Sequence, residues 1–374
     1  MKAVTPRQLD VYRTALPMRS FEHAAASRNL AEAIVVRVTF EDGSEGWGET
    51  LPRPYVTGET LDTVVADLAE TLWPAMAARP LSAAELTELP ARDATGRCLN
   101  AALCAVELAC QDGLLRRDPS SRRLPIRQRV SAVLGSRDPA KTARRLCLFR
   151  LGGLRDVKLK LALGESTDRA NLRVVHKRLA RCLRSGRCSL RVDVNGGWDI
   201  DEVPGRIEEL IPYGVSAVEQ PVYCSAAELA DLAGRCPLPL IADESLLTDA
   251  DAHALLSAGA KVRWNLRLSK NGGLSRTCRL AKLAGEHSIP VVVGCMVGES
   301  GILSAAQRRL LQRNPGVAFV EGNFGRFLLR DDLTRRSPRF GWRGKLRPLT
   351  EPGLGVKVDL AKLREYGELL MSRA

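Results

Sequence analysis

Three carboxylates close short apolar runs, and their spacing limits the possible folds more than any other feature of this chain. Asp193, Glu219 and Asp243 each end a run typical of a buried strand, and they are 26 and 24 residues apart. That interval is about one strand plus one helix, the period of a (β/α) barrel. Because parallel barrel strands end at the same rim, we expect the three acids to converge.

Converging carboxylates repel one another strongly unless a cation lies between them. The donors here are hard oxygen atoms, with no His or Cys beside them, which favours Mg²⁺ over zinc or copper and leaves Mn²⁺ as a substitute. We therefore predict a metal site formed by Asp193, Glu219 and Asp243.

From about residue 126 onward, apolar strand candidates alternate with helical segments, which predicts a closed parallel α/β barrel. Eight strand candidates recur, namely Arg129–Leu134, Val157–Leu161, Leu190–Val194, Ala217–Glu219, Leu238–Ala242, Val262–Leu268, Pro290–Val293 and Val317–Val320.

The residues before this region have a different order of predicted elements, with strands first and helices next. Ala33–Phe40 and Gly46–Thr50 flank a turn signal and predict a hairpin, and Leu99–Asp112 is apolar nearly all round, as in a buried helix. This order suggests a separate α+β domain. We predict three parts: an α+β domain at 1–125, the barrel at 126–325, and a turn-rich segment at 326–374 that returns to the first domain.

Composition limits the function more loosely. No run of eighteen apolar residues predicts a membrane span, and the N-terminus lacks the apolar core of a signal peptide. The ten cysteines contain no Cys-x-x-Cys pair, so we expect free thiols and a cytoplasmic location. The net charge of +13 is spread over Arg-rich helices, which indicates solvated faces and a field that steers anionic substrates. Without a nucleic-acid motif, we expect no nucleic acid and no membrane as partner, only a small carboxylate.

Two lysines share one face of the second barrel strand. In Asp156–Leu161, Lys158 and Lys160 alternate with apolar residues that must face the helices, so both lysines point into the barrel. The residues then suggest enolisation: a metal-bound carboxylate substrate loses its α-proton to a neutral lysine, and the cation stabilises the new charge. Lys160 is the candidate base, with Lys158 as its cationic neighbour; a structural ion pair is the alternative reading.

Several motifs in this order resemble one known family. They are Gly46–Glu49, Tyr55–Thr60, Lys158-x-Lys160, Asp193–Trp198, Glu219–Pro221, Ala242–Ser245, Lys270–Gly273 and Pro352–Gly355. The chain resembles the enolase superfamily, in the subgroup of muconate-lactonising enzymes, o-succinylbenzoate synthases and dipeptide epimerases. The resemblance implies a capping α+β domain over a (β/α)₇β modified TIM barrel. It also implies Mg²⁺ on the three acids, Lys160 as acid/base, Lys158 as electrostatic neighbour, and Asn195 and Glu244 supporting the metal ligands.

Two positions depart from the family pattern. The sixth strand usually ends in a second catalytic lysine, but this chain has Arg267, and an arginine is a poor base that can still stabilise an enolate. Lys270 is a poor replacement if the strand stays extended, since it then faces the opposite side. At strand eight, Glu321-Gly322-Asn323 replaces the Asp-x-Asp that holds a substrate ammonium group in dipeptide epimerases.

Substrate contacts are expected from two cap loops, at 18–23 and 52–56, and from the ends of strands seven and eight. Arg19 and Arg53 could bind a distal carboxylate in a bidentate way, although surface arginines are the alternative. His23 is equally well a plain loop residue. The remaining candidate contacts are Tyr55, Met296, Glu299, Glu321 and Asn323.

Together, these features predict a Mg²⁺-dependent enolising enzyme acting on a small carboxylate. The reaction expected is a cycloisomerisation or a syn elimination, with Lys160 as acid/base and Arg267 stabilising charge. Epimerisation of a dipeptide or N-acyl amino acid is the first alternative, and a metal-binding homologue without activity is the second. By resemblance, we expect a homo-oligomer.

Overall fold

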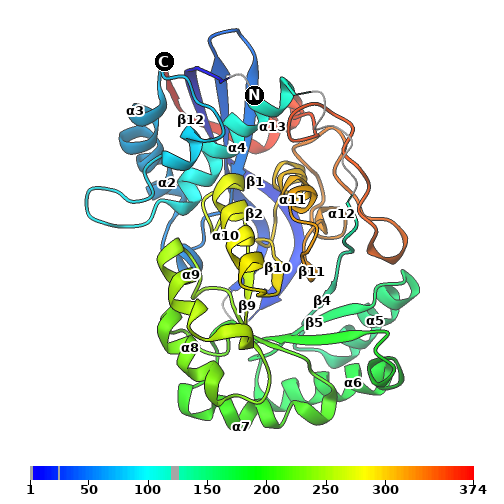
Figure 1. The fold of residues 1–374 in the computed structure, drawn as a ribbon. Helices are drawn as coiled ribbons and strands as arrows, with labels where there is room; N and C mark the ends of the chain where they lie inside the picture. Colours follow the sequence, from blue (N-terminus) through cyan, green and yellow to red (C-terminus); the bar gives the residue numbers. More distant parts are fainter. Residues whose placement is uncertain (1–2, 24–25, 119–125) are drawn as a thin grey trace.

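The chain folds into a barrel with an α+β unit over one end (Figure 1). A computed structural model describes residues 3–23, 26–118 and 126–374. Within these ranges, no helix combines the length and the apolar character needed to cross a bilayer.

Eight parallel strands form the barrel sheet in sequential order, and seven helices connect them. A parallel bridge between Val130 and Val320 joins the two edges of the sheet and closes it. The strands are β4 (Ala132–Leu134), β5 (Asp156–Lys160), β6 (Ser189–Asp193), β7 (Val218–Glu219), β8 (Leu240–Ala242), β9 (Val262–Leu266), β10 (Val291–Val293) and β11 (Phe319–Val320). The helices are α5 (Pro139–Leu151), α6 (Glu165–Arg184), α7 (Val203–Glu208), α8 (Ala226–Arg235), α9 (Asp249–Leu256), α10 (Leu274–Glu286) and α11 (Gly301–Arg313). The predicted (β/α)₇β barrel is confirmed.

Capping boxes mark where two barrel helices begin. Ser225 exchanges hydrogen bonds with Glu228 at the start of α8, and Thr248 does the same with Asp251 at the start of α9. Each pair satisfies backbone N–H groups that have no partner within the first helical turn.

The cap contains an antiparallel sheet in the order β12-β1-β2-β3, which brings both ends of the chain to the same side of the molecule (Figure 1). Its strands are β1 (Pro6–His23), β2 (Ala26–Phe40), β3 (Glu45–Thr50) and β12 (Gly367–Arg373), and β12 follows α13 (Leu360–Tyr366). Its other helices are α1 (Pro54–Thr57), α2 (Leu61–Asp67), α3 (Trp73–Met76) and α4 (Asn100–Arg116). The pairing of β12 with β1 supports the predicted return of the C-terminal segment, while the exact boundaries at 125 and 325 stay predictions.

Buried carboxylates join the cap to the barrel. Glu49 of β3 accepts hydrogen bonds from the backbone N–H groups of Ser300 and Leu303, where α11 begins. Glu107 of α4 accepts hydrogen bonds from Leu274 and Ser275 at the start of α10. Each acid satisfies free N–H groups at a helix N-terminus, so the cap is fixed above two barrel helices.

Two expectations are corrected. Cys182 and Cys188 form a disulfide between the end of α6 and the start of β6, whereas free thiols were expected; their Cα atoms lie 5.3 Å apart because the chain turns back tightly there. Residues 18–23 belong to β1 instead of forming a loop, although the register against β2 shifts between Pro17 and Phe21. Side chains from 20 to 28, including His23, lie outside the described part.

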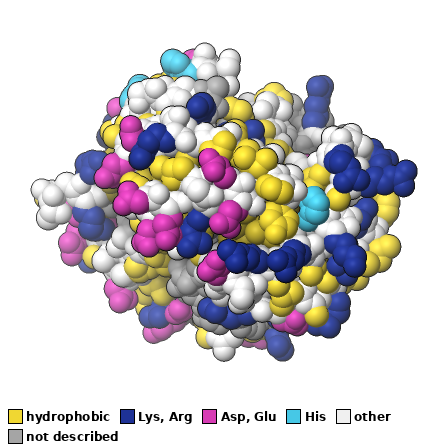
Figure 2. Space-filling model, turned by 90° about the horizontal axis from the view of Figure 1, so that it is seen from below, with side chains coloured by type: hydrophobic (Ala, Val, Ile, Leu, Met, Phe, Trp, Pro, Cys, Tyr) yellow, Lys and Arg dark blue, Asp and Glu magenta, His cyan; other side chains and the backbone are white. Residues whose placement is uncertain are grey.

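Part of the excess positive charge lies on exposed helix faces, as the sequence predicts, but Arg308 and Arg309 of the Arg-rich helix α11 are buried, where they donate hydrogen bonds to backbone carbonyls. Figure 2 shows Lys and Arg side chains gathered on the side where α5 and α6 lie in Figure 1, while Asp and Glu lie mostly on the other side. On α6, Arg173, Arg178, Arg181 and Arg184 are exposed.

Candidate active site

The three carboxylates meet at the C-terminal rim of the barrel. Lys160, Asp193 and Glu219 are direct partners across β5, β6 and β7, and Asp243 follows the last residue of β8. All three acids are completely buried. Strand pairing and side-chain alternation therefore bring these residues together from separate parts of the sequence.

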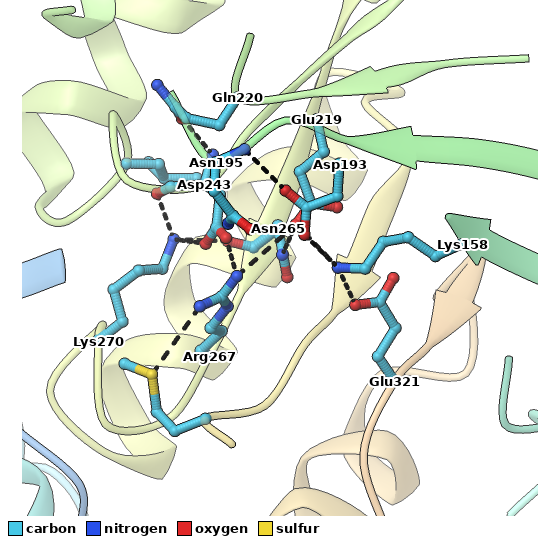
Figure 3. A network of polar contacts seen from close by, with 12 residues as sticks. Lys158, Asp193, Asn195, Glu219, Gln220, Asp243, Asn265, Arg267, Lys270 and Glu321 are labelled. Carbon is cyan, nitrogen blue, oxygen red and sulfur yellow. Dashed lines mark hydrogen bonds and ion pairs between the residues drawn. The ribbon is translucent and has the colours of Figure 1, made fainter. Parts of the chain in front are cut away.

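Lys158 points into the barrel among these acids (Figure 3), and Lys160, on the same face of β5, is buried beside Asp193. Nζ of Lys158 lies 3.0 Å from Glu219 and 3.2 Å from Asp193, and it also pairs with Glu321. Nζ of Lys160 lies 3.2 Å from Asp193 and donates a 2.7 Å hydrogen bond to Oδ1 of Asn195. Asn195 thus orients Lys160.

The acids around Lys158 keep its side chain positively charged. Burial alone would lower the pKa of Lys158, but Glu219, Glu321 and Asp193 outweigh burial and raise that pKa well above its usual value. Burial would raise the pKa of Asp193, yet Lys160 and Lys158 hold it below its usual range. Lys158 therefore stays positively charged and is unsuited to accept a proton.

Arg267 and Lys270 approach the acids from the opposite side. The guanidinium group of Arg267 binds Asp243, and its Nη2 atom is 3.6 Å from Oε1 of Glu219. Gly294 leaves the space for this arrangement, because a Cβ atom there would collide with Asn265 and lie 3.1 Å from Arg267. Lys270 donates to the backbone carbonyls of Asp243 and Asn265 (2.6 and 2.8 Å), so it holds this segment in place.

The predicted metal ligands fit a divalent cation in their chemistry. Oε2 of Glu219 and Oδ1 of Asp243 are buried and accept no hydrogen bond from the described residues, although Nζ of Lys270 is 3.2 Å from the latter. As the described side chains stand, no three of them are arranged to hold an ion, because Lys158 and Arg267 lie among the acids. The chemistry of these oxygen donors suits a hard cation such as Mg²⁺.

A cavity of about 330 Å³ opens above this rim. Its floor includes Lys158, Lys160, Asn195, Glu244 and Arg267. Of the predicted substrate contacts, the cavity is lined by Arg19, Tyr55, Met296, Glu299, Glu321 and Asn323.

Comparison with known proteins identifies the family. The family profile "Enolase C-terminal domain-like" matches residues 140–362. The chain belongs to the enolase superfamily.

Relatives of this superfamily member include both epimerases and cycloisomerases. An L-Lys-D/L-Arg epimerase from Methylococcus capsulatus is 31% identical, over 90% of this chain and 94% of the relative. Muconate cycloisomerase 1 from Rhodococcus opacus is 27% identical, over 93% and 94%. The crystal structure of N-succinyl Arg/Lys racemase from Bacillus cereus superposes with a TM-score of 0.86 over 99% of both chains, at 23% identity, which shows the shared fold. This superfamily member is therefore an isomerase-type enzyme with a cap and a TIM barrel.

The structure corrects one predicted contact of this superfamily member. Arg53 is buried and is not among the residues that line the cavity. Its guanidinium group donates to the backbone carbonyls of Glu32, Pro52 and Val297. Arg53 therefore holds the cap strands and the end of β10 together, in a position unsuited to bind a distal carboxylate.

The residues at the end of β11 line the cavity but already have protein partners. Glu321 pairs with Lys158 and, at 2.7 Å, with Arg191. Asn323 accepts a hydrogen bond from Arg308 (2.9 Å) and donates one to Gln307 (2.5 Å). Their predicted role in substrate binding stays a prediction.

Three further residues shape the site without having been singled out from the sequence. They are Arg191, Gln220 and Asn265. Arg191 stands two residues before Asp193 in the same strand, and this alternation was the signal for a second inward-facing charge. Gln220 accepts hydrogen bonds from the backbone N–H groups of Asp243 and Ser245, a contact between neighbouring strands that no local pattern reveals.

Proposed function

We propose that this enzyme enolises a small carboxylate substrate, in a cycloisomerisation or a syn elimination, with Lys160 as the acid and base. The observation that carries the proposal is the asymmetry of the cavity floor. Lys160 reaches it on one side, and on the other side Arg267 stands where a second lysine is usual. An arginine side chain stays protonated in proteins, so only one face of the substrate meets a base.

Each charged residue of the site has a separate role in the proposed reaction. Lys160, oriented by Asn195, takes the α-proton and returns it in the second half of the reaction. Lys158 stays cationic and adds positive charge beside the place where the substrate carboxylate would bind. Arg267 pairs with the negative charge that develops on the substrate. When bound by Asp193, Glu219 and Asp243, Mg²⁺ (or Mn²⁺) supplies positive charge beside the substrate carboxylate.

Deuterium exchange tests the proposal. The enzyme is incubated in D₂O with Mg²⁺ and a panel of dipeptides, N-succinyl amino acids and acid sugars, and deuterium at the α-carbon is followed by NMR. We expect exchange without inversion, and we expect Lys160→Ala to abolish it. Lys177→Ala, on the exposed face of α6, is the control that should exchange like the parent protein. A fully active Lys160→Ala variant contradicts the assignment of the base.

Epimerisation of a dipeptide or N-acyl amino acid is a second candidate, supported by the activities named for similar proteins, such as the L-Lys-D/L-Arg epimerase. Exchange accompanied by inversion in the same assay favours it. Arg267→Lys restores a lysine on each face and should convert exchange with retention into exchange with inversion.

Two smaller proposals accompany this function. We retain the expectation of a homo-oligomer, which size-exclusion chromatography with light scattering tests. We also retain a cytoplasmic location, because eight cysteines in the described part of the chain are free and one pair, Cys182 and Cys188, forms a disulfide; cell fractionation tests it.

A further inference from the structure

One side of the cavity is apolar, in contrast to its charged floor. Leu148 and Phe149 of α5 form part of this wall, and Phe324, Phe327 and Leu328 from the segment after β11 form the rest. Phe327 and Leu328 belong to α12 (Gly325–Leu328). These five side chains are called the apolar wall below.

Several of the phenylalanine rings of this protein lie together there. The chain has seven phenylalanines, and four of them form one cluster beside the cavity. The ring centroids of Phe149 and Phe324 lie 5.8 Å apart in an edge-to-face arrangement, and those of Phe324 and Phe340 lie 5.1 Å apart. Phe327 completes the cluster, 5.6 Å from Phe340. Ring pairs at these separations attract one another and form a firm surface for another apolar group.

Part of the apolar wall remains open to solvent. Leu148 is 67% exposed and Phe327 is 49% exposed, although both line the cavity. Exposed apolar side chains at the mouth of a concave site are typical of a ligand-binding surface, since a ligand recovers the free energy of their burial.

The partners of two polar residues argue against a cationic occupant on this side. Glu321 and Asn323, which line the cavity just before Phe324 in the chain, are held by Lys158, Arg191, Arg308 and Gln307. Binding a substrate ammonium group there would require breaking these buried contacts, which is costly.

We propose that the substrate carries an uncharged aromatic or branched apolar group, and that this group packs against Leu148, Phe324 and Phe327. The inference rests on the proposed function, because the substrate carboxylate at the charged floor sets the direction in which the apolar group extends. It adds a substrate class, namely carboxylates that carry an apolar group away from the reacting α-carbon; N-acyl-alanines are used below only as binding probes for this group.

Three probes that share an L-alanine carboxylate and differ in their acyl group test the inference by calorimetric titration in the presence of Mg²⁺. They are N-acetyl-, N-succinyl- and N-(3-phenylpropanoyl)-L-alanine. We expect the phenylpropanoyl probe to bind about tenfold more tightly than the acetyl probe, from the burial of its ring. The succinyl probe should gain no such advantage.

Matched variants locate the contact. Leu148→Ala and Phe327→Ala should each lower the affinity for the phenylpropanoyl probe about three- to tenfold. Both variants should leave the affinity for the acetyl probe unchanged. Leu151→Ala is the control, because Leu151 lies on the same helix, is also 67% exposed, and is not among the lining residues. It should leave both probes unchanged.

The inference is overturned if the succinyl probe binds most tightly, or if the phenylpropanoyl probe gains nothing over the acetyl probe, including the case in which neither binds. It is equally overturned if the two wall variants behave like Leu151→Ala. The failure of the proposed function gives a different result: a preference for the phenylpropanoyl probe without any α-proton exchange.

Discussion

At the scale of single residues, Arg267 decides how this site handles a metal ion. Its guanidinium group binds Asp243 and lies 3.6 Å from Glu219, so it competes for two of the three proposed metal ligands. We expect Arg267→Lys, with a shorter and more compact cation, to raise the affinity for Mn²⁺ about tenfold, which corresponds to about 1.4 kcal/mol. Mn²⁺ binding measured by EPR or calorimetry checks this without any turnover.

Arg263→Lys is the control, since Arg263 lies on β9, the strand that ends just before Arg267, but outside the cavity lining, and this variant should bind Mn²⁺ like the parent. An unchanged or weaker affinity in Arg267→Lys would show that the guanidinium group does not compete with the ion.

Single residues also show which side-chain positions the sequence predicts and which it does not. The acids and lysines were predictable because side-chain alternation and the common rim of parallel strands fix where they point. The burial of Arg53 was not, because its acceptors are backbone carbonyls of Glu32 and Val297, residues far away in the sequence. Because every residue has a backbone carbonyl, the sequence does not show which carbonyls Arg53 contacts.

At the scale of elements, strand positions follow from apolar runs, but strand ends depend on local hydrogen bonds. The sequence predicts a sixth strand reaching Leu268, whereas β9 ends at Leu266. The backbone N–H of Arg267 donates to Oδ1 of Asn271 (2.9 Å), and the chain turns there. This turn brings Lys270 next to Asp243, on the same side as Arg267, contrary to what an extended strand predicts. Lys270 is nevertheless completely buried and is not among the residues that line the cavity, so it does not offer the substrate a second base.

The contact between β3 and α4 depends on glycine. A Cβ atom at Gly48 would overlap the backbone carbonyl of Ala105, and one at Gly46 would overlap that of Ala109. Because the obstacle is helix backbone, we expect Gly48→Ala to lower the free energy of unfolding by about 3 kcal/mol. Urea denaturation measures this change.

Gly234→Ala provides the opposite control. Gly234 lies on the exposed side of α8, and no atom lies within 4 Å of its hypothetical Cβ. This substitution should raise the free energy of unfolding by about 0.5–1 kcal/mol, because alanine has a higher helix propensity than glycine. Equal effects of the two substitutions would refute the close-packing argument.

At the scale of the whole molecule, the joint between cap and barrel depends on buried acids, and this makes stability depend on pH. Burial raises the pKa of Glu49 to about 7, more than its hydrogen bonds with Ser300 and Leu303 lower it. In the unfolded chain the group titrates near 4.5. The folded protein therefore keeps a proton that the unfolded chain has lost, and the contribution of Glu49 to stability is complete below about pH 4.5 and is lost as the pH rises through 7.

Unfolding by urea between pH 5 and pH 8 tests this linkage. We expect Glu49→Gln to remove a decline in the free energy of unfolding on the order of 2 kcal/mol across this range, while the amide oxygen still accepts hydrogen bonds from α11. Glu59 is another buried acid with a raised pKa, and Glu49 is not among the groups that shift it. Its contribution to the pH dependence is therefore the same in both proteins and cancels in the difference between the two curves. Glu41→Gln, on an exposed turn, should reproduce the parent curve. If Glu49→Gln reproduces it too, the N–H groups of α11 keep Glu49 ionised, and the joint is held by a charged helix cap.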